Sequence, residues 1–150
     1  MEHKEIDGVS KKWEFLEFED SIRWMTYKMV DEMADKIGSG IAQWAGLKCG
    51  DKIGMYMETK REWMQTAIAC FQRGIVLSTC YANLGEEALI HVINQCELST
   101  IVTDHNLLDS LEKIAPQCPS LKKVIYVGKP SNFPVSSHYK IISFDELTKL

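Results

Sequence analysis

Residues 50–104 of this chain read GDKIGMYMETKREWMQTAIACFQRGIVLSTCYANLGEEALIHVINQCELSTIVTD, and the fold class follows from them. Three short apolar runs, at 53–57, 75–79 and 100–103, alternate with two segments whose apolar residues recur every three or four positions. The runs predict buried strands, and the segments predict amphipathic helices. Strands that alternate with helices form parallel sheets. The sequence therefore predicts an α/β fold: a mostly parallel, Rossmann-like sheet with helices on both faces.

Local signals predict where the helices begin and end. Thr59 and Glu62 have the Thr-x-x-Glu spacing of a capping box, which predicts a helix from about Lys60. We expect its buried face to consist of Trp63, Ala67, Cys70 and Phe71. Asp104 or Asn106 is expected to cap a later helix. The apolar residues of that helix are Leu107, Leu108, Leu111 and Ile114.

The pattern continues on both sides of this stretch. An earlier helix carries the apolar stripe Met33, Ile37, Ile41 and Trp44. Gly46 comes after it, as expected for a left-handed helix stop. Two further strands are expected at 123–127 and 141–142.

By length the chain is expected to be one domain, preceded by a short N-terminal segment. Residues 1–23 mix charges with aromatics and form an N-terminal extension or an edge strand that includes Trp13, Phe15 and Phe18. Residues 24–150 form the α/β subdomain. Ser143 and Glu146 make another capping box, but the helix that they begin has little length in which to bury Leu147. We interpret this as a fragment boundary.

Composition narrows the class of protein. The 150 residues include 17 basic and 21 acidic side chains, a net charge of −4, which argues against a nucleic-acid partner. There is neither a signal-peptide pattern nor a run long enough to span a bilayer. The five cysteines show no CxxC spacing and are expected to be reduced, core-facing thiols in an intracellular protein.

Each candidate motif also has a structural interpretation. Gly38-Ser39-Gly40 lacks the third glycine of a dinucleotide fingerprint and is expected to serve helix packing. Asp104 follows a strand at the edge where open α/β sheets bind ligands, but it could equally cap a helix. Lys60 with Arg61 could meet an anion or form a solvated first turn. The histidines, His91, His3, His105 and His138, have no partners at metal-ligand or catalytic spacing.

Several motifs resemble those of long-chain fatty-acid–CoA ligases (acyl-CoA synthetases), which belong to the adenylate-forming enzymes. The matching segments are WMTY at 24–27, GDKIG at 50–54, ETKREW at 58–63, ACF at 69–71 and YANLGEEA at 81–88. The sequence departs from the family pattern at Lys60-Arg61, where Arg-Pro is usual, and at Ala82-Asn83, which replace Asp-Thr.

The resemblance implies a reaction and a place in the enzyme. Family members use ATP and magnesium to form an acyl-adenylate from a fatty acid, then pass the acyl group to CoA. The chain resembles the N-terminal portion, before the ATP-binding motifs. We therefore assign no catalytic, cofactor-binding or metal-ligating residue and expect no cofactor bound to this chain alone. The parent enzyme is expected to be cytoplasmic or peripherally attached to an organelle membrane.

Two other classes remain open at this stage. A free-standing binding or regulatory module of flavodoxin or receiver type would share the fold class. A receiver, however, needs an acidic pair after its first strand, and Glu58 is the single acid there. The second of these classes is a truncated protein that acts only through contacts. For a fragment, we also expect self-association through uncovered apolar surface.

Overall fold

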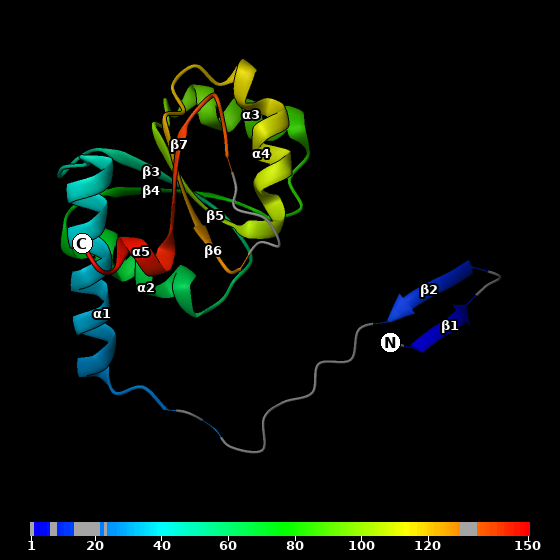
Figure 1. The fold of residues 1–150 in the computed structure, drawn as a ribbon, viewed down its shortest axis with the longest axis horizontal. Coiled ribbons are helices and arrows are strands. Elements are labelled where there is room, and N and C mark those ends of the chain that lie inside the picture. The colour runs from blue at the N-terminus through cyan, green and yellow to red at the C-terminus, as the bar shows by residue number, and fades with distance from the viewer. Residues whose placement is uncertain (1, 7–8, 14–21, 23, 130–134) are drawn as a thin grey trace.

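The computed structural model describes residues 2–6, 9–13, 22, 24–129 and 135–150, and their strands form two sheets. The larger sheet has five parallel strands in the order β4-β3-β5-β6-β7 (Figure 1). These strands are β3 (Lys52–Tyr56), β4 (Val76–Cys80), β5 (Thr100–Asp104), β6 (Lys123–Val127) and β7 (Lys140–Ser143). The expected strand positions are confirmed to within a residue or two. Where one face of a strand is buried, the apolar pattern leaves little freedom for its register.

Helices cover both faces of this sheet, as the alternating pattern predicts. They are α1 (Tyr27–Gly40), α2 (Arg61–Gln72), α3 (Glu86–Gln95), α4 (Leu108–Ile114) and α5 (Phe144–Leu147). The last turns of the first helix widen into a π-helix, Ile41–Ala45, and Gly46 ends it in the left-handed conformation with φ 74°. Short 3-10 turns flank α4 at His105–Leu107 and Ala115–Gln117.

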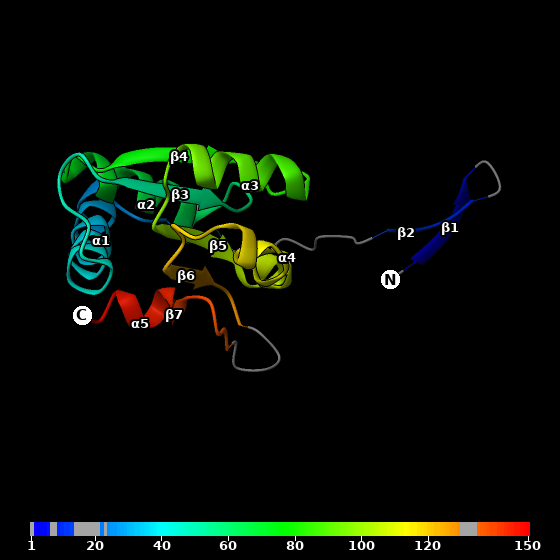
Figure 2. The same ribbon diagram turned by 90° about the horizontal axis from the view of Figure 1, so that it is seen from above.

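Two hydrophobic cores lie on opposite faces of the sheet. Figure 2 shows the helices that cover the two faces, with α1, α2 and α5 on one side and α3 and α4 on the other. Successive side chains of a strand alternate between faces, so Met55 joins the core with α1, α2 and α5, while Tyr56 joins the core with α3 and α4. The α/β class with helices on both faces is therefore confirmed.

The N-terminal residues form a separate antiparallel pair, β1 (Glu2–Ile6) with β2 (Val9–Trp13). Trp13 ends this second strand. The rest of the expected edge strand, including Phe15 and Phe18, lies outside the described residues. The division of the chain at residues 23 and 24 stays a prediction.

Glycines of α1 serve close helix packing, as expected. A Cβ at Gly38 would overlap the side chain of Arg73, and a Cβ at Gly40 would overlap Leu147. Leu147 is fully buried against this helix. The expectation that the last helix has little to bury is therefore wrong, because one turn is enough to place Leu147 in the core.

Three sequence expectations near α2 and α4 are also wrong. Thr59 is exposed and caps nothing, since the N-cap position is Lys60 and no side chain accepts a hydrogen bond there. Asp104 and Asn106 likewise do not cap the helix that follows them. Phe71 is exposed rather than buried, because it lies on the flank of α2 that faces away from α1.

The cysteines are all free, but they are not all core residues. Cys70, Cys80 and Cys118 are buried and Cys96 is half-buried. Cys49 is exposed because it lies in the turn before β3, which corrects the expectation for that thiol. Among the described residues, no helix combines the length and apolarity that crossing a bilayer requires.

Candidate functional site

A pocket of about 620 Å³ opens where β3, β4 and β5 end. Its walls come from the loops that follow these three strands and from the first turn of α2. The lining residues are Met57, Glu58, Thr59, Trp63, Thr79, Cys80, Tyr81, Ala82, Asn83, Asn106 and Leu107. Parallel strands bring their carboxyl ends to one edge, so segments far apart in sequence meet here.

This edge is also the topological switch point of the sheet. From β3 the chain passes over one face to β4, then crosses the other face to β5 on the far side of β3 (Figure 2). The loops after β3 and β5 therefore diverge to opposite faces. Open α/β sheets bind ligands in the crevice that such divergence leaves.

Asp104 ties the two diverging loops together. Its Oδ2 accepts a hydrogen bond from the backbone N–H of Glu58 at 3.0 Å, and its Oδ1 forms an ion pair with Lys60 Nζ. The residue is only 2% exposed, and that ion pair is the one interaction of Oδ1. A buried carboxylate needs such partners, because desolvation of an unpaired charge is costly. Asp104 thus fixes the β3–α2 loop, whose residues Glu58 and Thr59 line the pocket.

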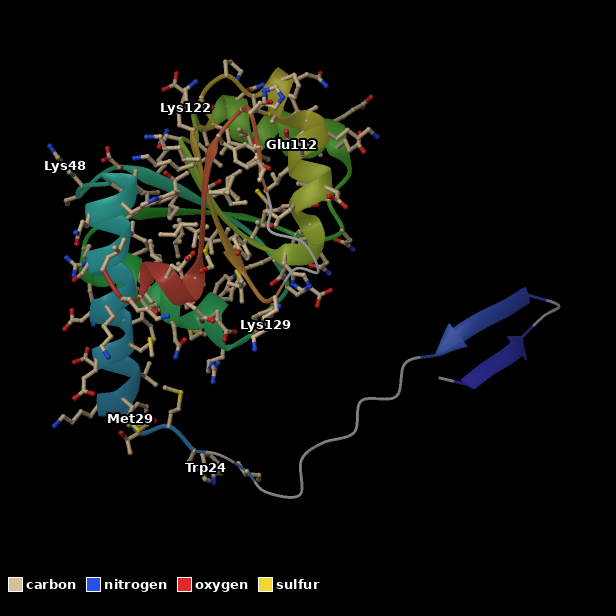
Figure 3. The ribbon with its side chains drawn as sticks, viewed as in Figure 1. Trp24, Met29, Lys48, Glu112, Lys122 and Lys129 are labelled. Carbon is tan, nitrogen blue, oxygen red and sulfur yellow. The ribbon has the colours of Figure 1, made fainter. Side chains whose placement is uncertain are left out.

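The charges at this edge do not fit the phosphates of ATP. Glu58 is the one charged residue among those that line the pocket. Lys60 forms an ion pair with Asp104, and Arg61 forms one with Glu62, with 2.8 Å between the guanidinium nitrogen and the carboxylate oxygen. Figure 3 shows Lys129 beyond the end of β6, and Lys48 and Lys122 at the opposite edge of the sheet. A triphosphate carries a high negative charge that cations normally balance, and the described residues that line this pocket include none.

Burial raises the pKa values of two reactive groups at or beside the pocket. Burial raises the pKa of the Cys80 thiol, and the nearby Cys96 adds to the effect. Burial also raises the pKa of Tyr56, which adjoins Cys80, although a hydrogen bond with Ser110 acts in the opposite direction. A thiol is a weak nucleophile compared with its thiolate. The described residues contain no cluster of histidine, cysteine or carboxylate side chains suited to a metal ion.

The arrangement can therefore bind and orient a ligand, but it does not offer a nucleophile or an acid–base pair. The lining combines the apolar side chains of Met57, Trp63 and Leu107 with the amide groups of Asn83 and Asn106. Such a pocket suits a ligand with an apolar body and a few hydrogen-bonding groups.

Comparison with protein families shows to which family the chain belongs. A profile described as AMP-binding enzyme matches residues 7–142, which is most of the chain. The chain belongs to the AMP-binding enzyme family. The motifs between residues 24 and 88 that resemble this class all lie inside the matched region.

Relatives of this family member include several long-chain ligases. Long chain acyl-CoA synthetase 8 of Arabidopsis thaliana is 32% identical over 70% of this chain. Long-chain-fatty-acid–CoA ligase 1 of Schizosaccharomyces pombe is 28% identical over the whole chain, and the Saccharomyces cerevisiae ligase 1 is 32% identical over 86% of it. The chain spans 14%, 23% and 19% of these three relatives.

A solved structure supports the fold of this family member. The crystal structure of the anthranilate CoA ligase AuaEII in complex with anthranoyl-AMP superimposes with a TM-score of 0.74 at 18% identity. The match covers 85% of this chain and 23% of that one. At this identity the likeness concerns the fold alone.

The family match also separates the two classes that share this topology. Counted from β3, the strand order is 2-1-3-4-5, which is the order of flavodoxins and receivers. Topology alone therefore cannot distinguish them from a ligase subdomain. The family and the relatives do, and they do not favour the free-standing module.

The structure brings together some residues that the sequence singled out and leaves others apart. Asp104 and Lys60, considered separately in the sequence, form an ion pair. His91 is exposed on α3, away from the pocket lining. Sequence reasoning missed the contribution of Thr79, Asn83 and Leu107 to the pocket. The signal was available, since each lies at or just beyond the end of a predicted strand.

Proposed function

We propose that this chain is the N-terminal portion of a long-chain fatty-acid–CoA ligase. The enzyme joins a fatty acid to ATP as an acyl-adenylate and then transfers the acyl group to CoA. The observation that carries the proposal is the match to long-chain ligases over 70% to 100% of this chain, within a family profile that spans residues 7–142.

The chain's own contribution is the parallel sheet and its carboxyl-edge pocket. Because the pocket residues do not fit a triphosphate, we assign no nucleotide contact and no reaction step to them. ATP, magnesium and CoA belong to the proposed whole enzyme, and we propose that this chain alone binds none of them. The fatty acid is the proposed acyl substrate, and nucleic acid is not a proposed partner. We place the enzyme inside the cell, in the cytoplasm or peripherally on an organelle membrane.

A graft tests the proposal. Residues 24–150 of this chain would replace the aligned segment of the Saccharomyces cerevisiae ligase 1, to which the chain is 32% identical. The graft is expected to retain ATP-dependent formation of acyl-CoA from a long-chain fatty acid. A matched graft that carries Ile37→Asp in the core should lose activity together with cooperative thermal unfolding. A graft that unfolds cooperatively but makes no acyl-CoA would contradict the proposal.

A further inference from the structure

A hollow of about 380 Å³ lies at the amino edge of the sheet, where β6 and β7 begin. This edge is opposite to the candidate site, and Figure 3 shows Lys122 on it. The lining includes three lysines, a histidine and two serines: Lys122, Lys123, Lys140, His138, Ser136 and Ser137. No carboxylate is among the described residues that line the hollow, although the whole chain carries a net charge of −4.

The pairing of β6 with β7 brings the lysines together. Lys123 lies opposite Lys140 in the register of these parallel strands, and the backbone N–H of Lys140 donates to the carbonyl of Lys122 at 2.9 Å. Positive charges on paired strands repel each other, and a bound anion removes that repulsion. The topology of the sheet therefore concentrates positive charge at one place on an acidic chain.

One of the three lysines is anchored and two are available. The Lys123 Nζ donates to the carbonyl oxygens of Trp44 and Ala45, each at 2.9 Å, at the end of the π-helix. Lys122 and Lys140 are exposed, and neither forms an ion pair within the described part of the chain. Two ammonium groups can therefore turn toward a ligand, beside a third charge that is fixed.

The segment before β7 adds hydrogen-bond donors to the hollow. Ser136 Oγ accepts the backbone N–H groups of His138 at 3.0 Å and of Tyr139 at 3.4 Å, which holds the segment in a turn. The Ser137 hydroxyl and the His138 imidazole can then donate to a ligand. The ring Nε2 of His138 lies 3.9 Å from Oε1 of Glu112, a residue outside the described lining. Ammonium, hydroxyl and imidazole donors together suit the oxygens of a phosphate.

An exposed apolar side chain adjoins this basic hollow. Val135 directly precedes Ser136 and is 85% exposed. Lysines beside an exposed apolar residue are typical of surfaces that bind anionic membranes. The charges attract the headgroups, and the apolar side chain enters the boundary with the acyl chains.

We propose that this hollow binds the phosphorylated headgroup of an anionic membrane lipid. A phosphate monoester dianion is held by the two available lysines and the anchored Lys123, and Val135 enters the lipid interface beside it. The inference rests on the peripheral membrane location proposed for the enzyme, and the ligase reaction plays no part in it. The pocket at the carboxyl edge then faces away from the membrane, because the hollow is on the opposite edge of the sheet.

Two double variants with the same loss of charge test the proposal. Lys122→Gln with Lys140→Gln removes the two available cations, whereas Lys36→Gln with Lys129→Gln removes two exposed lysines elsewhere. Co-sedimentation measures binding to phosphatidylcholine vesicles that contain a phosphatidylinositol monophosphate. We expect the unsubstituted chain and K36Q/K129Q to bind, and K122Q/K140Q to bind more weakly by roughly tenfold or more. Circular dichroism checks that both double variants are folded.

Nuclear magnetic resonance of the unsubstituted chain locates the site without a variant. Inositol bisphosphate, a soluble form of the headgroup, should shift the amide signals of Ser137, His138 and Lys140. The amide signals of Asn83 and Asn106, at the carboxyl edge, should not move. Shifts confined to the carboxyl edge would overturn the proposal.

Other outcomes also overturn the proposal. They are a chain that does not bind the vesicles, equal loss of binding in both double variants, and no loss in either. Equally tight binding to phosphatidylserine vesicles of the same surface charge would exclude recognition of a phosphate monoester. Binding of inorganic phosphate without binding of the vesicles would exclude the membrane lipid. The acyl-CoA assay of the graft tests the ligase reaction separately.

Discussion

The carboxylate of Asp104, at the end of β5, holds the ammonium group of Lys60 across the switch point of the sheet. The same carboxylate accepts the backbone N–H of Glu58. Two loops that leave for opposite faces are thereby joined beside the pocket.

Loss of this carboxylate should destabilise the fold. Asp104→Ala leaves the Glu58 N–H and Lys60 without their partner, and we expect a loss of about 1–3 kcal/mol in the free energy of unfolding. Asp109→Ala, an exposed acid in the first turn of α4, should change stability by less than about 0.5 kcal/mol. Urea denaturation of both variants measures the difference. Equal effects would mean that Asp104 does not join the loops.

The two Ser/Thr-x-x-Glu patterns should respond differently to the loss of their first residue. Ser143 accepts the Glu146 N–H at 3.2 Å, and Glu146 accepts the Ser143 N–H in return. Ser143→Ala should therefore cost about 0.5–2 kcal/mol. Thr59→Ala should have almost no effect, because Thr59 is exposed and caps nothing. A larger loss for Thr59 in thermal unfolding would contradict the described start of α2.

The last helix should contribute to the core through one side chain. Leu147→Ala removes a fully buried residue and should cost about 2–5 kcal/mol. Leu150→Ala, which is 52% exposed, should cost much less. Guanidinium denaturation of the pair decides this. Similar small losses would mean that α5 does not dock against Gly40.

Thiol reactivity should distinguish the cysteines in the native state. Burial raises the pKa of Cys70 to about 12, so this thiol should stay protonated and unlabelled at neutral pH, while the exposed Cys49 reacts. The raised pKa stabilises the fold at pH values below the unfolded pKa of the thiol, and this contribution is lost as pH rises toward 12. Alkylation followed by peptide mass spectrometry reports the order in which the cysteines are labelled. Rapid native labelling of Cys70 would contradict it.

The parts of the fold that local patterns determine could be predicted from sequence. The strands at 53–57 and 100–103 are apolar runs between turn signals, and the Ser143–Glu146 box closes on itself within one turn. The prediction that Thr59 caps α2 was wrong because Lys60 is the N-cap. Lys60 forms an ion pair with Asp104, a residue 44 positions away that no local pattern reveals. The pocket was predictable only in part. The ends of the strands can be located from the sequence, but the loops that converge on the pocket depend on the order of the strands in the sheet.

The exposure of Phe71 required the arrangement of whole elements. Its spacing within α2 fits a buried stripe, and periodicity alone cannot say that the neighbouring strand lies at a sheet edge. The same ambiguity affects Leu147, whose burial depends on the close approach that Gly40 of α1 allows.

Pyrophosphate release by the 150-residue chain, with ATP, magnesium and a long-chain fatty acid, tests the central claim most directly. The claim is that this family member supplies the sheet and pocket of a ligase without the groups that hold the phosphates. The account predicts no release above a protein-free control, while the Saccharomyces cerevisiae graft releases pyrophosphate in the same assay. Fatty-acid-dependent release by the chain alone would contradict the account.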